Sequence, residues 1–491
     1  MARARWRPRA VPVWLLVASV VLASAAARVP MLDARLGSDE GGFLMVAGQW
    51  DPGSSLYGDY WVDRPPLIIG LFQLADAFGG GAVALRLLGL ACVVLSVGLA
   101  AVLGRVVAPR RRYAPVLTAV VAAVFLASPL FGAFEVDGEL LALPFVLAGL
   151  VAVLRAAAGT GRRSVGWWLC AGAAAAAAAA VKQSMVEVVV AAGAVVLVEL
   201  GRRHVGRAAA AVAALAVGAA AVTGLLLAWA VAEGTSLRGL YDAVVTFRFD
   251  ASAVISASAS AATEQRATAI AISFALSGAA VVLLVAAVPV LGRRRPSYDV
   301  VAAAVTAAVV GWELAAVAAG GSYWHHYLLG TVAGLVLATA FAVQHYPRRG
   351  RLLAAALGYA ALVTAVTLAA VVPTASSATS TTEAAAYLRA HAAPGDTGVV
   401  AFGEPVLLRE AGLDSPYPNL WSLTARVRDP DLRQFTRVLR GPRRPTWVVV
   451  AGESLATWGI DAARAEPVLA RHYRLVHVDG AWHVYHEVPS G

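Results

Sequence analysis

The sequence of 491 residues has only two cysteines, Cys92 and Cys170, and a single lysine, Lys182. Both cysteines lie inside apolar runs, which excludes a disulfide framework and a cysteine metal site. Charged residues are also scarce, at 14% against about 25% in soluble globular proteins. Hydrophobic residues make up 59% and the mean hydropathy is +0.70, and no water-soluble fold can bury so much apolar surface. The composition therefore indicates a membrane protein.

Long apolar runs account for most of this surplus. A transmembrane helix needs about 20 predominantly apolar residues, and eleven runs of this kind are bounded by charge, Pro or Gly. The eleven predicted spans are 11–27, 82–107, 115–131, 140–154, 165–181, 185–200, 208–231, 267–291, 300–319, 327–343 and 352–372. The first run follows an arginine-rich start and ends in small residues, so it also fits a cleaved signal peptide.

Arginines are distributed unevenly between the loops. With the N-terminus inside, the inside segments hold twenty arginines, among them Arg110 to Arg112 and Arg293 to Arg295. The outside loops before residue 376 hold eight basic residues and 14 acids. Lys and Arg accumulate on the cytoplasmic side, so we expect a cytoplasmic N-terminus and an extracytoplasmic C-terminus in the plasma membrane. The net charge of +10 is then a topology signal, and no nucleic-acid partner is needed to explain it.

The segment 376–491 is different in kind, because its 12 basic and 12 acidic residues balance. Its patterns predict helices at 382–392, 429–439 and 461–473 and strands at 398–402, 446–451, 474–478 and 481–486. We therefore predict a polytopic α-helical membrane domain at 1–375, with about 11 transmembrane helices, and an extracytoplasmic α/β domain at 376–491. The second domain carries no nucleotide-binding or catalytic motif, which favours a structural lid.

Acidic clusters mark two of the predicted outside loops. The loop 28–81 contains SDEGGF (38–43) and DYWVDRPPL (59–67), and the loop 132–139 contains EVDGE (135–139). Adjacent carboxylates can act as a general base or bind a cation, although solvated loop charges are the plainer interpretation. Because both loops lie on the same predicted membrane face, we expect the clusters to converge on one site.

Further polar residues lie at the same predicted depth. Lys182 lies in the turn VKQSM, Glu313 lies inside the ninth span, and GGSYWHHY leads into the tenth with His325 and His326. Ionisable residues within a membrane are costly and indicate function by default. Tyr, Trp and His are also ordinary residues of the membrane interface.

Five features of the sequence together resemble the GT-C superfamily of membrane glycosyltransferases, both in their order along the chain and because all are predicted on the same membrane face. They are the Asp-Glu motif, the Pro-Pro motif, the second acidic motif, Lys182 and HHYLL (325–329). The resemblance is greatest to bacterial relatives of the dolichyl-phosphate-mannose protein mannosyltransferases and of the lipid A aminoarabinose transferases. It departs from them where Asp63 and Arg64 precede the prolines, because many relatives carry Lys or His there.

The resemblance implies an inverting transfer of a sugar from a polyprenyl-phosphate donor to an acceptor at the outer membrane face. Asp39 is then the expected general base, with Glu40 as its neighbour or substitute. The residues expected to bind substrate are Arg64, Lys182, His325 and His326 at the phosphate, and Asp137 and Glu139 at the sugar or acceptor. Some members of the superfamily use a divalent cation, which in this chain would lie between Asp39 and Asp137. We expect no metal and no other cofactor for this protein.

Two other classes of function stay open at this stage. A polytopic transporter or lipid flippase would show charged or broken helices near the midplane and an internal repeat, and we find no repeat. A non-catalytic assembly or sensor protein is the other alternative. Under the glycosyltransferase hypothesis the sugar stays open between mannose, arabinose and aminoarabinose, and the acceptor between protein, lipid and glycan.

Overall fold

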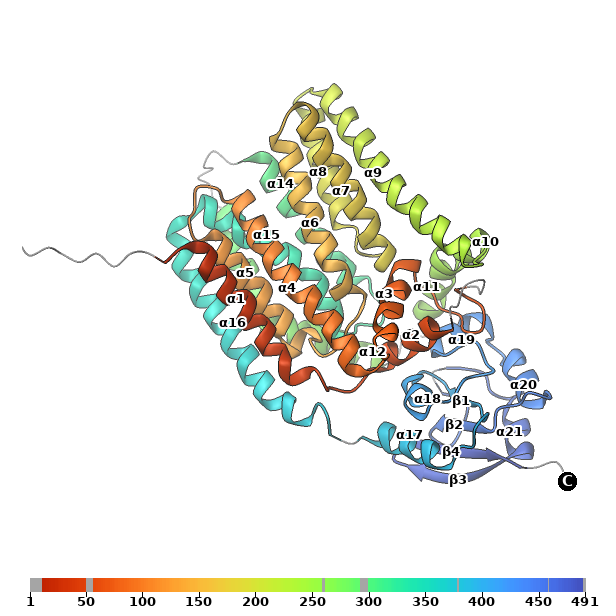
Figure 1. Ribbon diagram of the computed structural model, residues 1–491. Coiled ribbons are helices and arrows are strands. Elements are labelled where there is room, and N and C mark those ends of the chain that lie inside the picture. Colours follow the sequence, from red (N-terminus) through yellow and green to blue (C-terminus); the bar gives the residue numbers. More distant parts are fainter. Residues whose placement is uncertain are drawn as a thin grey trace, which may run out of the picture.

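A computed structural model describes residues 11–49, 56–257, 261–291, 299–377, 379–457 and 459–488. Three features of the sequence lie outside these residues, namely Asp51, the arginines between Arg3 and Arg9, and Arg293 to Arg295. The described part forms a bundle of long helices with a smaller domain at one end (Figure 1).

Most of the predicted spans form helices of the bundle in close to their predicted positions. The long helices are α1 (Val13–Arg28), α4 (Ala82–Val107), α5 (Ala114–Ala127), α6 (Gly138–Ala158), α7 (Gly161–Val181), α8 (Glu187–Gly201), α9 (Val205–Ala232), α12 (Ala261–Leu276), α13 (Ala279–Leu291), α14 (Val300–Ala318), α15 (Val332–His345) and α16 (Gly350–Val371).

Short helices fill the connections. They are η1 (Val29–Met31), α2 (Ser38–Gly48), α3 (Pro66–Ala77), η2 (Pro129–Phe131), α10 (Leu237–Tyr241), η3 (Asp242–Thr246), α11 (Phe247–Ala257), η4 (His325–Thr331), η5 (Pro347–Arg349) and η6 (Val372–Thr374). Helix α3 begins at the Pro-Pro motif, since proline suits the first helical positions.

Eight helices among the described residues are long and apolar enough to cross a membrane, and the bent pair α12 and α13 makes a ninth span if it counts as one. Each of the eleven predicted spans is helical, but α5 and α8 fall short, with 14 and 15 residues. The polytopic helical fold is thus confirmed, whereas the structure supports fewer full-length spans than the sequence predicts.

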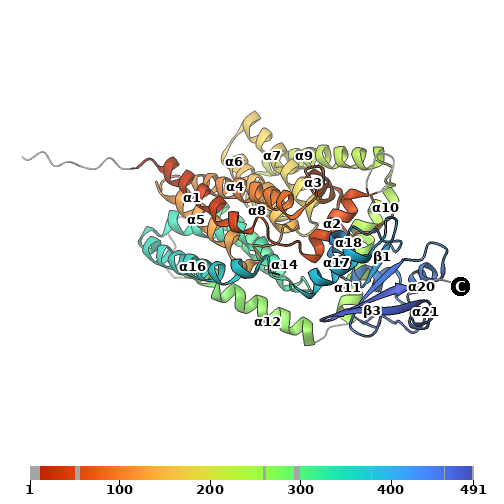
Figure 2. The same ribbon diagram turned by 60° about the horizontal axis from the view of Figure 1, so that its bottom comes forward.

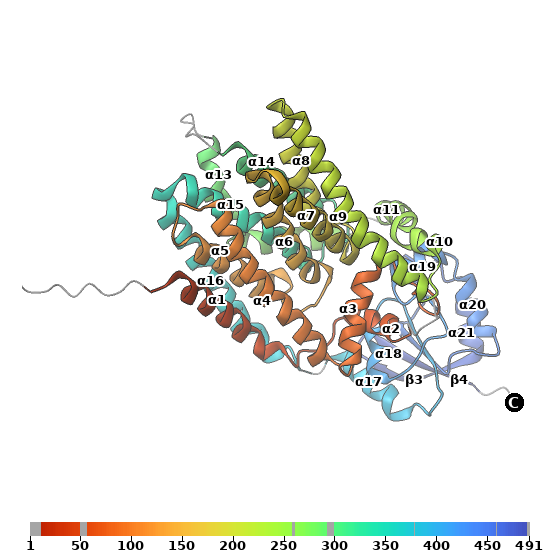
Figure 3. The same ribbon diagram turned by 45° about the horizontal axis from the view of Figure 1, so that its top comes forward.

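Small residues allow the bundle helices to approach closely. Helices α7 and α9 cross at Gly172 and Gly218, where an added Cβ would collide with the backbone of the other helix. Close backbone contact through small residues is a main source of helix association in membranes, because lipid tails are as apolar as the side chains. Helix α9 then leads through α10 toward the smaller domain (Figure 3).

The smaller domain is built on a four-stranded sheet in the order β1-β2-β4-β3. The strands are β1 (Gly398–Ala401), β2 (Trp447–Ala451), β3 (Tyr473–Asp479) and β4 (Trp482–Glu487), and the helices are α17 (Ser380–His391), α18 (Val406–Ala411), α19 (Ser422–Arg428), α20 (Arg433–Arg440) and α21 (Glu466–His472). Strand β1 pairs in parallel with β2, and the other pairs are antiparallel. All four predicted strands are therefore present.

Two predicted helices of this domain begin later than expected. Asp429, predicted as the first residue of a helix, lies before α20 and accepts the backbone N–H groups of Gln434 and Phe435 at 2.8 and 2.9 Å. Asp favours this capping role over a helix interior. Helix α21 starts at Glu466 with Pro467 in its first turn, which fixes its beginning.

The smaller domain packs directly on α2 and α3 (Figures 1 and 3). A Cβ added at Gly41 would lie 2.6 Å from Cα of Val406, so α2 and α18 are in backbone contact. Arg409 of α18 pairs with Asp76 of α3 at 2.6 Å. The backbone N–H of Trp61 donates to the carbonyl of Pro418 at 2.9 Å. The two domains thus share an interface that includes α2, α3 and the segment between them.

Candidate active site

The adjacent acids Asp39 and Glu40 lie in the first turn of α2, which begins at Ser38. Carboxylates are favourable there, because the free N–H groups at a helix N-terminus carry partial positive charge. The Glu40 side chain turns back and accepts the backbone N–H of Gly37 at 2.7 Å, which closes the first turn. Beyond this shared position, the two acids have different partners.

Glu40 is fully engaged by its neighbours. Both of its oxygens pair with the guanidinium of Arg86 on α4, Oε2 at 2.8 Å, and Oε1 also accepts the N–H of Val136 at 2.6 Å. Glu40 is 1% exposed and Arg86 is 3% exposed. The pair ties α2 to α4 and to the loop 132–139, so the structure does bring the two acidic clusters together.

Asp39 is half-buried and has a different environment. Its Oδ1 accepts a hydrogen bond from the indole N–H of Trp421, in the smaller domain, at 2.8 Å. Burial raises the pKa of the Asp39 carboxyl above its ordinary value, and the negative charge of Asp137 raises it further. A carboxylate with a raised pKa is suited to accept a proton during a reaction.

Asp137 lies directly before α6 and is 4% exposed. Its Oδ2 lies 2.9 Å from Nδ1 of His326 on η4, and the same nitrogen lies 2.8 Å from Oε2 of Glu135. Burial acts to raise the pKa of Asp137, but the imidazole of His326 and the charges of Lys182 and Arg64 together lower it below its ordinary value. The two neighbouring carboxyl groups Asp39 and Asp137 are therefore shifted in opposite directions.

Glu135, Asp137 and His326 could also hold a metal ion. One ligand atom from each residue lies within 4.8 Å of the others. Carboxylate oxygens and an imidazole nitrogen are ligands that zinc accepts. From the sequence we expect no metal, and the cation that some family members use would lie between Asp39 and Asp137. The cluster in the structure contains Asp137 and not Asp39.

Lys182 lies in the turn between α7 and α8 and forms an ion pair with Glu139 of α6. Its ammonium also lies 4.9 Å from the ring centroid of Tyr327. A Cβ added at Gly138 would lie 2.9 Å from Cδ of Lys182, so this glycine makes room for the side chain. The only lysine of the chain is thus held beside the loop that carries Asp137.

Arg64 lies in the segment before α3, with its guanidinium 2.6 Å from Asp63 and over the ring of Phe43 at 5.4 Å. Asp63 also pairs with Arg248 of α11. Burial acts to raise the pKa of Asp63, but the two guanidinium groups together lower it. Asp63, in the segment before α3, therefore pairs with two guanidinium groups.

The two histidines predicted to bind substrate, His325 and His326, lie in different environments. His326 is buried against the two acids described above, whereas His325 is exposed. Sequence reasoning gave no role to Trp421, Glu404 or Tyr327. The pKa of Glu404 is raised to about 7 by burial and by the charge of Asp39, which places this side chain of the smaller domain in the same electrostatic environment. No motif in the sequence marks Trp421 or Glu404.

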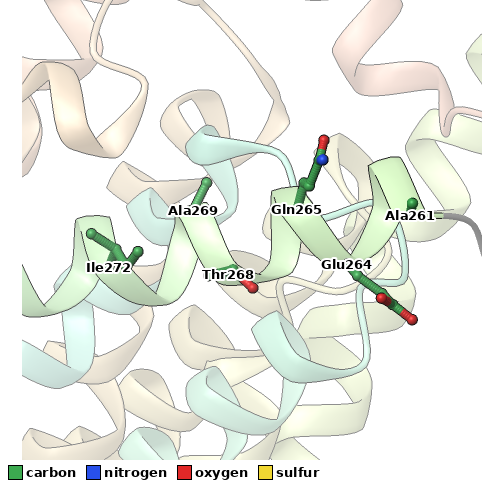
Figure 4. A pocket seen from close by; sticks show the side chains of 6 residues that line it. All are labelled: Ala261, Glu264, Gln265, Thr268, Ala269 and Ile272. Carbon is green, nitrogen blue, oxygen red and sulfur yellow. The ribbon is translucent and has the colours of Figure 1, made fainter.

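A hollow elsewhere on the surface lies apart from these residues. It is lined by one side of α12, a helix that lies on the outside of the bundle (Figure 2). The side chains that line it all come from this helix, namely Ala261, Glu264, Gln265, Thr268, Ala269 and Ile272 (Figure 4). It contains none of the predicted site residues, so the acidic and basic residues near the N-terminus of α2 form the stronger candidate.

No family model and no curated protein matches the sequence. Among solved structures, ArnT from Cupriavidus metallidurans bound to undecaprenyl phosphate is 15% identical, with a TM-score of 0.58 and coverage of 97% of this chain and 98% of that chain. The apo state of the same protein is 14% identical, with a TM-score of 0.61 and the same coverage. The similarity extends over both domains. The chain therefore has the GT-C fold that the sequence motifs predicted.

Proposed function

We propose that the protein is an inverting glycosyltransferase that moves a sugar from a polyprenyl-phosphate donor to an acceptor hydroxyl. The observation that carries this proposal is the pair of carboxyl groups with opposite pKa shifts, Asp39 and Asp137, set among cationic side chains. Neighbouring carboxyl groups whose environments separate their pKa values are typical of enzyme active sites, and the group with the raised pKa is the candidate base.

Asp39 is the proposed general base. It is half-buried, its pKa is raised, and one of its oxygens is fixed by Trp421. A positioned base that takes the acceptor proton contributes roughly 10²- to 10⁴-fold to the rate. Glu40 is less suited to this step, because Arg86 engages both of its oxygens in a buried ion pair. We assign Glu40 a positioning role instead.

The leaving group in this reaction is a lipid phosphate, which departs as an anion. It needs cations to stabilise its growing charge and does not need a proton donor. The charge of Arg64 acts on both Asp39 and Asp137. The charge of Lys182 acts on Asp137, and Arg248 pairs with Asp63. We propose that these three side chains bind the phosphate, while Asp137, Glu139 and His326 orient the sugar or the acceptor. His325 is exposed and takes a minor part at most.

A single base with one displacement step inverts the anomeric configuration. The acceptor oxygen forms its bond to the anomeric carbon while the bond to the phosphate oxygen breaks, and Asp39 takes the acceptor proton. No metal or other cofactor takes part in this sequence of bonds. The imidazole of His326 already lies between Glu135 and Asp137, where it counters their charge.

A polyprenyl-phosphate donor is consistent with the fold and with the position of the candidate site in it. One solved structure that shares this fold is bound to undecaprenyl phosphate. An isoprenoid tail stays in the bilayer while its phosphate reaches the surface, and the candidate site lies at the ends of α6 and α7, where such a phosphate would be. The acceptor is a lipid, glycan or protein at the same surface.

The proposed membrane orientation places this site outside. The connections between α4 and α5 and between α8 and α9 lie at the end of the bundle away from the smaller domain (Figure 1). Both are arginine-rich, with Arg110 to Arg112 in the first and Arg202 and Arg203 in the second. By the positive-inside rule that end faces the cytoplasm of a plasma membrane.

A transporter or flippase is the second candidate, and one observation favours it. Helices α12 and α13 meet at an angle of 62°, and broken helices are common at transporter sites. The break consists of Ser277 and Gly278, with no charged residue to bind an ion or a substrate. The charged cluster lies at α2 instead, which favours chemistry at the surface over passage through the bundle.

The test uses purified protein in detergent and a set of radiolabelled polyprenyl-phosphate sugars that carry mannose, arabinose or aminoarabinose. We expect the wild-type protein to release or transfer one of these sugars, and Asp39→Asn to lose this activity. The same lipids in vesicles test the alternative. If labelled lipid crosses the bilayer, and if the wild-type protein and Asp39→Asn leave every sugar attached, the enzyme proposal is wrong.

A further inference from the structure

The smaller domain contacts the proposed base itself, which a structural lid does not require. Trp421 stands directly before α19 and donates its indole N–H to Oδ1 of Asp39 at 2.8 Å. The two residues are 382 positions apart in the chain. We propose that Trp421 is a positioning residue for glycosyl transfer, and that the smaller domain is thereby part of the active site. This inference rests on the proposed function.

The Trp421 side chain is held on several sides. Its backbone carbonyl accepts the N–H of Ala425 at 3.0 Å and the hydroxyl of Thr424 at 2.7 Å, which fixes the start of α19. Its ring lies 5.5 Å from the ring of Phe43, centroid to centroid. A Cβ added at Gly42 would collide with the indole, so the helix surface is shaped to admit it. The donor N–H is therefore presented in one direction.

The hydrogen bond has a defined consequence for Asp39. A carboxylate at a helix start can rotate, and the bond to Trp421 fixes one of its oxygens. Among the residues that the structure describes, no other hydrogen bond to the Asp39 side chain is found, which leaves Oδ2 to take the acceptor proton. Loss of correct orientation at a reacting group costs rate even when binding is unchanged.

The loop before α18 is a second part of the smaller domain that contacts the start of α2, next to Asp39. The hydroxyl of Ser38 donates to the carbonyl of Gly403 at 2.6 Å, directly beside Asp39 in the chain. Glu404 follows, and the charge of Asp39 contributes to its raised pKa. The smaller domain thus surrounds the start of α2 with a donor, an acceptor and a carboxyl group.

Trp421 is not needed merely to hold the domains together. Three other contacts hold the domains together without its N–H group. They are the ion pair of Arg409 with Asp76, the backbone hydrogen bond between Trp61 and Pro418, and the packing of Gly41 on Val406. A substitution that removes the N–H but keeps an aromatic ring should therefore affect the reaction more than the docking.

The experiment compares Trp421→Phe with a matched control, Trp447→Phe. Trp447 of β2 donates its indole N–H to Oδ2 of Asp396 at 2.9 Å, so the control removes the same kind of bond within the same domain. Steady-state transfer is measured for both variants, with kcat and the donor KM determined separately, together with the melting temperature. For Trp421→Phe we expect kcat to fall about tenfold, as for one hydrogen bond to a charged group, with the donor KM unchanged. We expect Trp447→Phe to keep the wild-type kcat.

Three results would overturn the inference. Wild-type kcat in Trp421→Phe would show that the bond has no role in the reaction. An equal fall of kcat in both variants would show that the domain's stability is responsible, and a rise of the donor KM alone would assign Trp421 to binding. A wild-type protein that transfers no sugar would instead contradict the proposed function, on which this inference depends.

Discussion

Asp39 and Glu40 are neighbours in sequence, but their environments separate them. Glu40 is enclosed by Arg86 and two backbone N–H groups, while Asp39 keeps one oxygen without a described partner. Burying two paired charges stabilises a protein little, but removing one of them leaves the other uncompensated. The Glu40–Arg86 pair should therefore matter for the fold, and Asp39 for the reaction.

The first prediction concerns this pair. Replacing Arg86 with Met leaves the buried Glu40 charge unpaired, and we expect the free energy of unfolding to fall by about 3–5 kcal/mol. Denaturation in detergent measures the change. Adding Glu40→Gln in the same chain should recover part of the loss, because the unpaired charge is gone. A variant Arg86→Met as stable as the wild-type protein would refute the assignment.

For single residues, the sequence reveals which acids are candidates but not the different roles of Asp39 and Glu40. The SDEGGF motif marks both Asp39 and Glu40, yet their difference depends on Arg86 of α4 and on Trp421, which lies far along the chain. Likewise HHYLL marks two histidines, and only the packing of η4 decides that His326 meets the acids and His325 does not. Contacts between distant segments carry no local pattern.

The elements were easier to predict than the contacts. Apolar runs bounded by charge predict the bundle helices well, since length and hydropathy determine spanning helices. Two short apolar runs and a hairpin pattern around Asp479 and Gly480 likewise predict the four strands of the smaller domain. The sequence could not show that α2 packs on α18, because two adjacent glycines in a loop motif also suit a flexible turn.

Helix α2 provides the second prediction. Gly41→Ala would bring a Cβ to 2.6 Å from Cα of Val406, and backbone cannot yield as a side chain can. We expect this variant to loosen the docking of the smaller domain, so that limited proteolysis between the domains becomes faster. Gly48→Ala, at the other end of the same helix, meets nothing closer than 3.7 Å and should behave as the wild-type protein. Equal protection of both variants would contradict this packing.

The whole molecule joins an arginine-rich end to an acidic end. The net charge of +10 reflects this division, and the proposed site lies at the end that carries the smaller domain. The sequence predicted the division from arginine positions alone, because the positive-inside rule acts on each short loop separately. It could not predict that the smaller domain reaches Asp39, since that contact depends on how the domain docks.

The third prediction tests this orientation. We expect a cysteine at Glu383, exposed on α17, to react on whole cells with a maleimide reagent that cannot cross membranes. A cysteine at Arg163, exposed near the start of α7, should react only after the membrane is opened. Both belong in a chain with Cys170 replaced by Ala, because Cys170 is exposed. The reverse labelling pattern would invert the proposed topology.

The central claim is that Asp39 takes the acceptor proton while the polyprenyl phosphate leaves. A single-turnover experiment with excess enzyme and labelled donor measures the rate of free polyprenyl phosphate formation, and donor binding is measured beside it. We predict that Asp39→Asn binds the donor as the wild-type protein does and releases the lipid phosphate at least about 10²-fold more slowly. Equal rates in the two proteins would show that Asp39 is not the base.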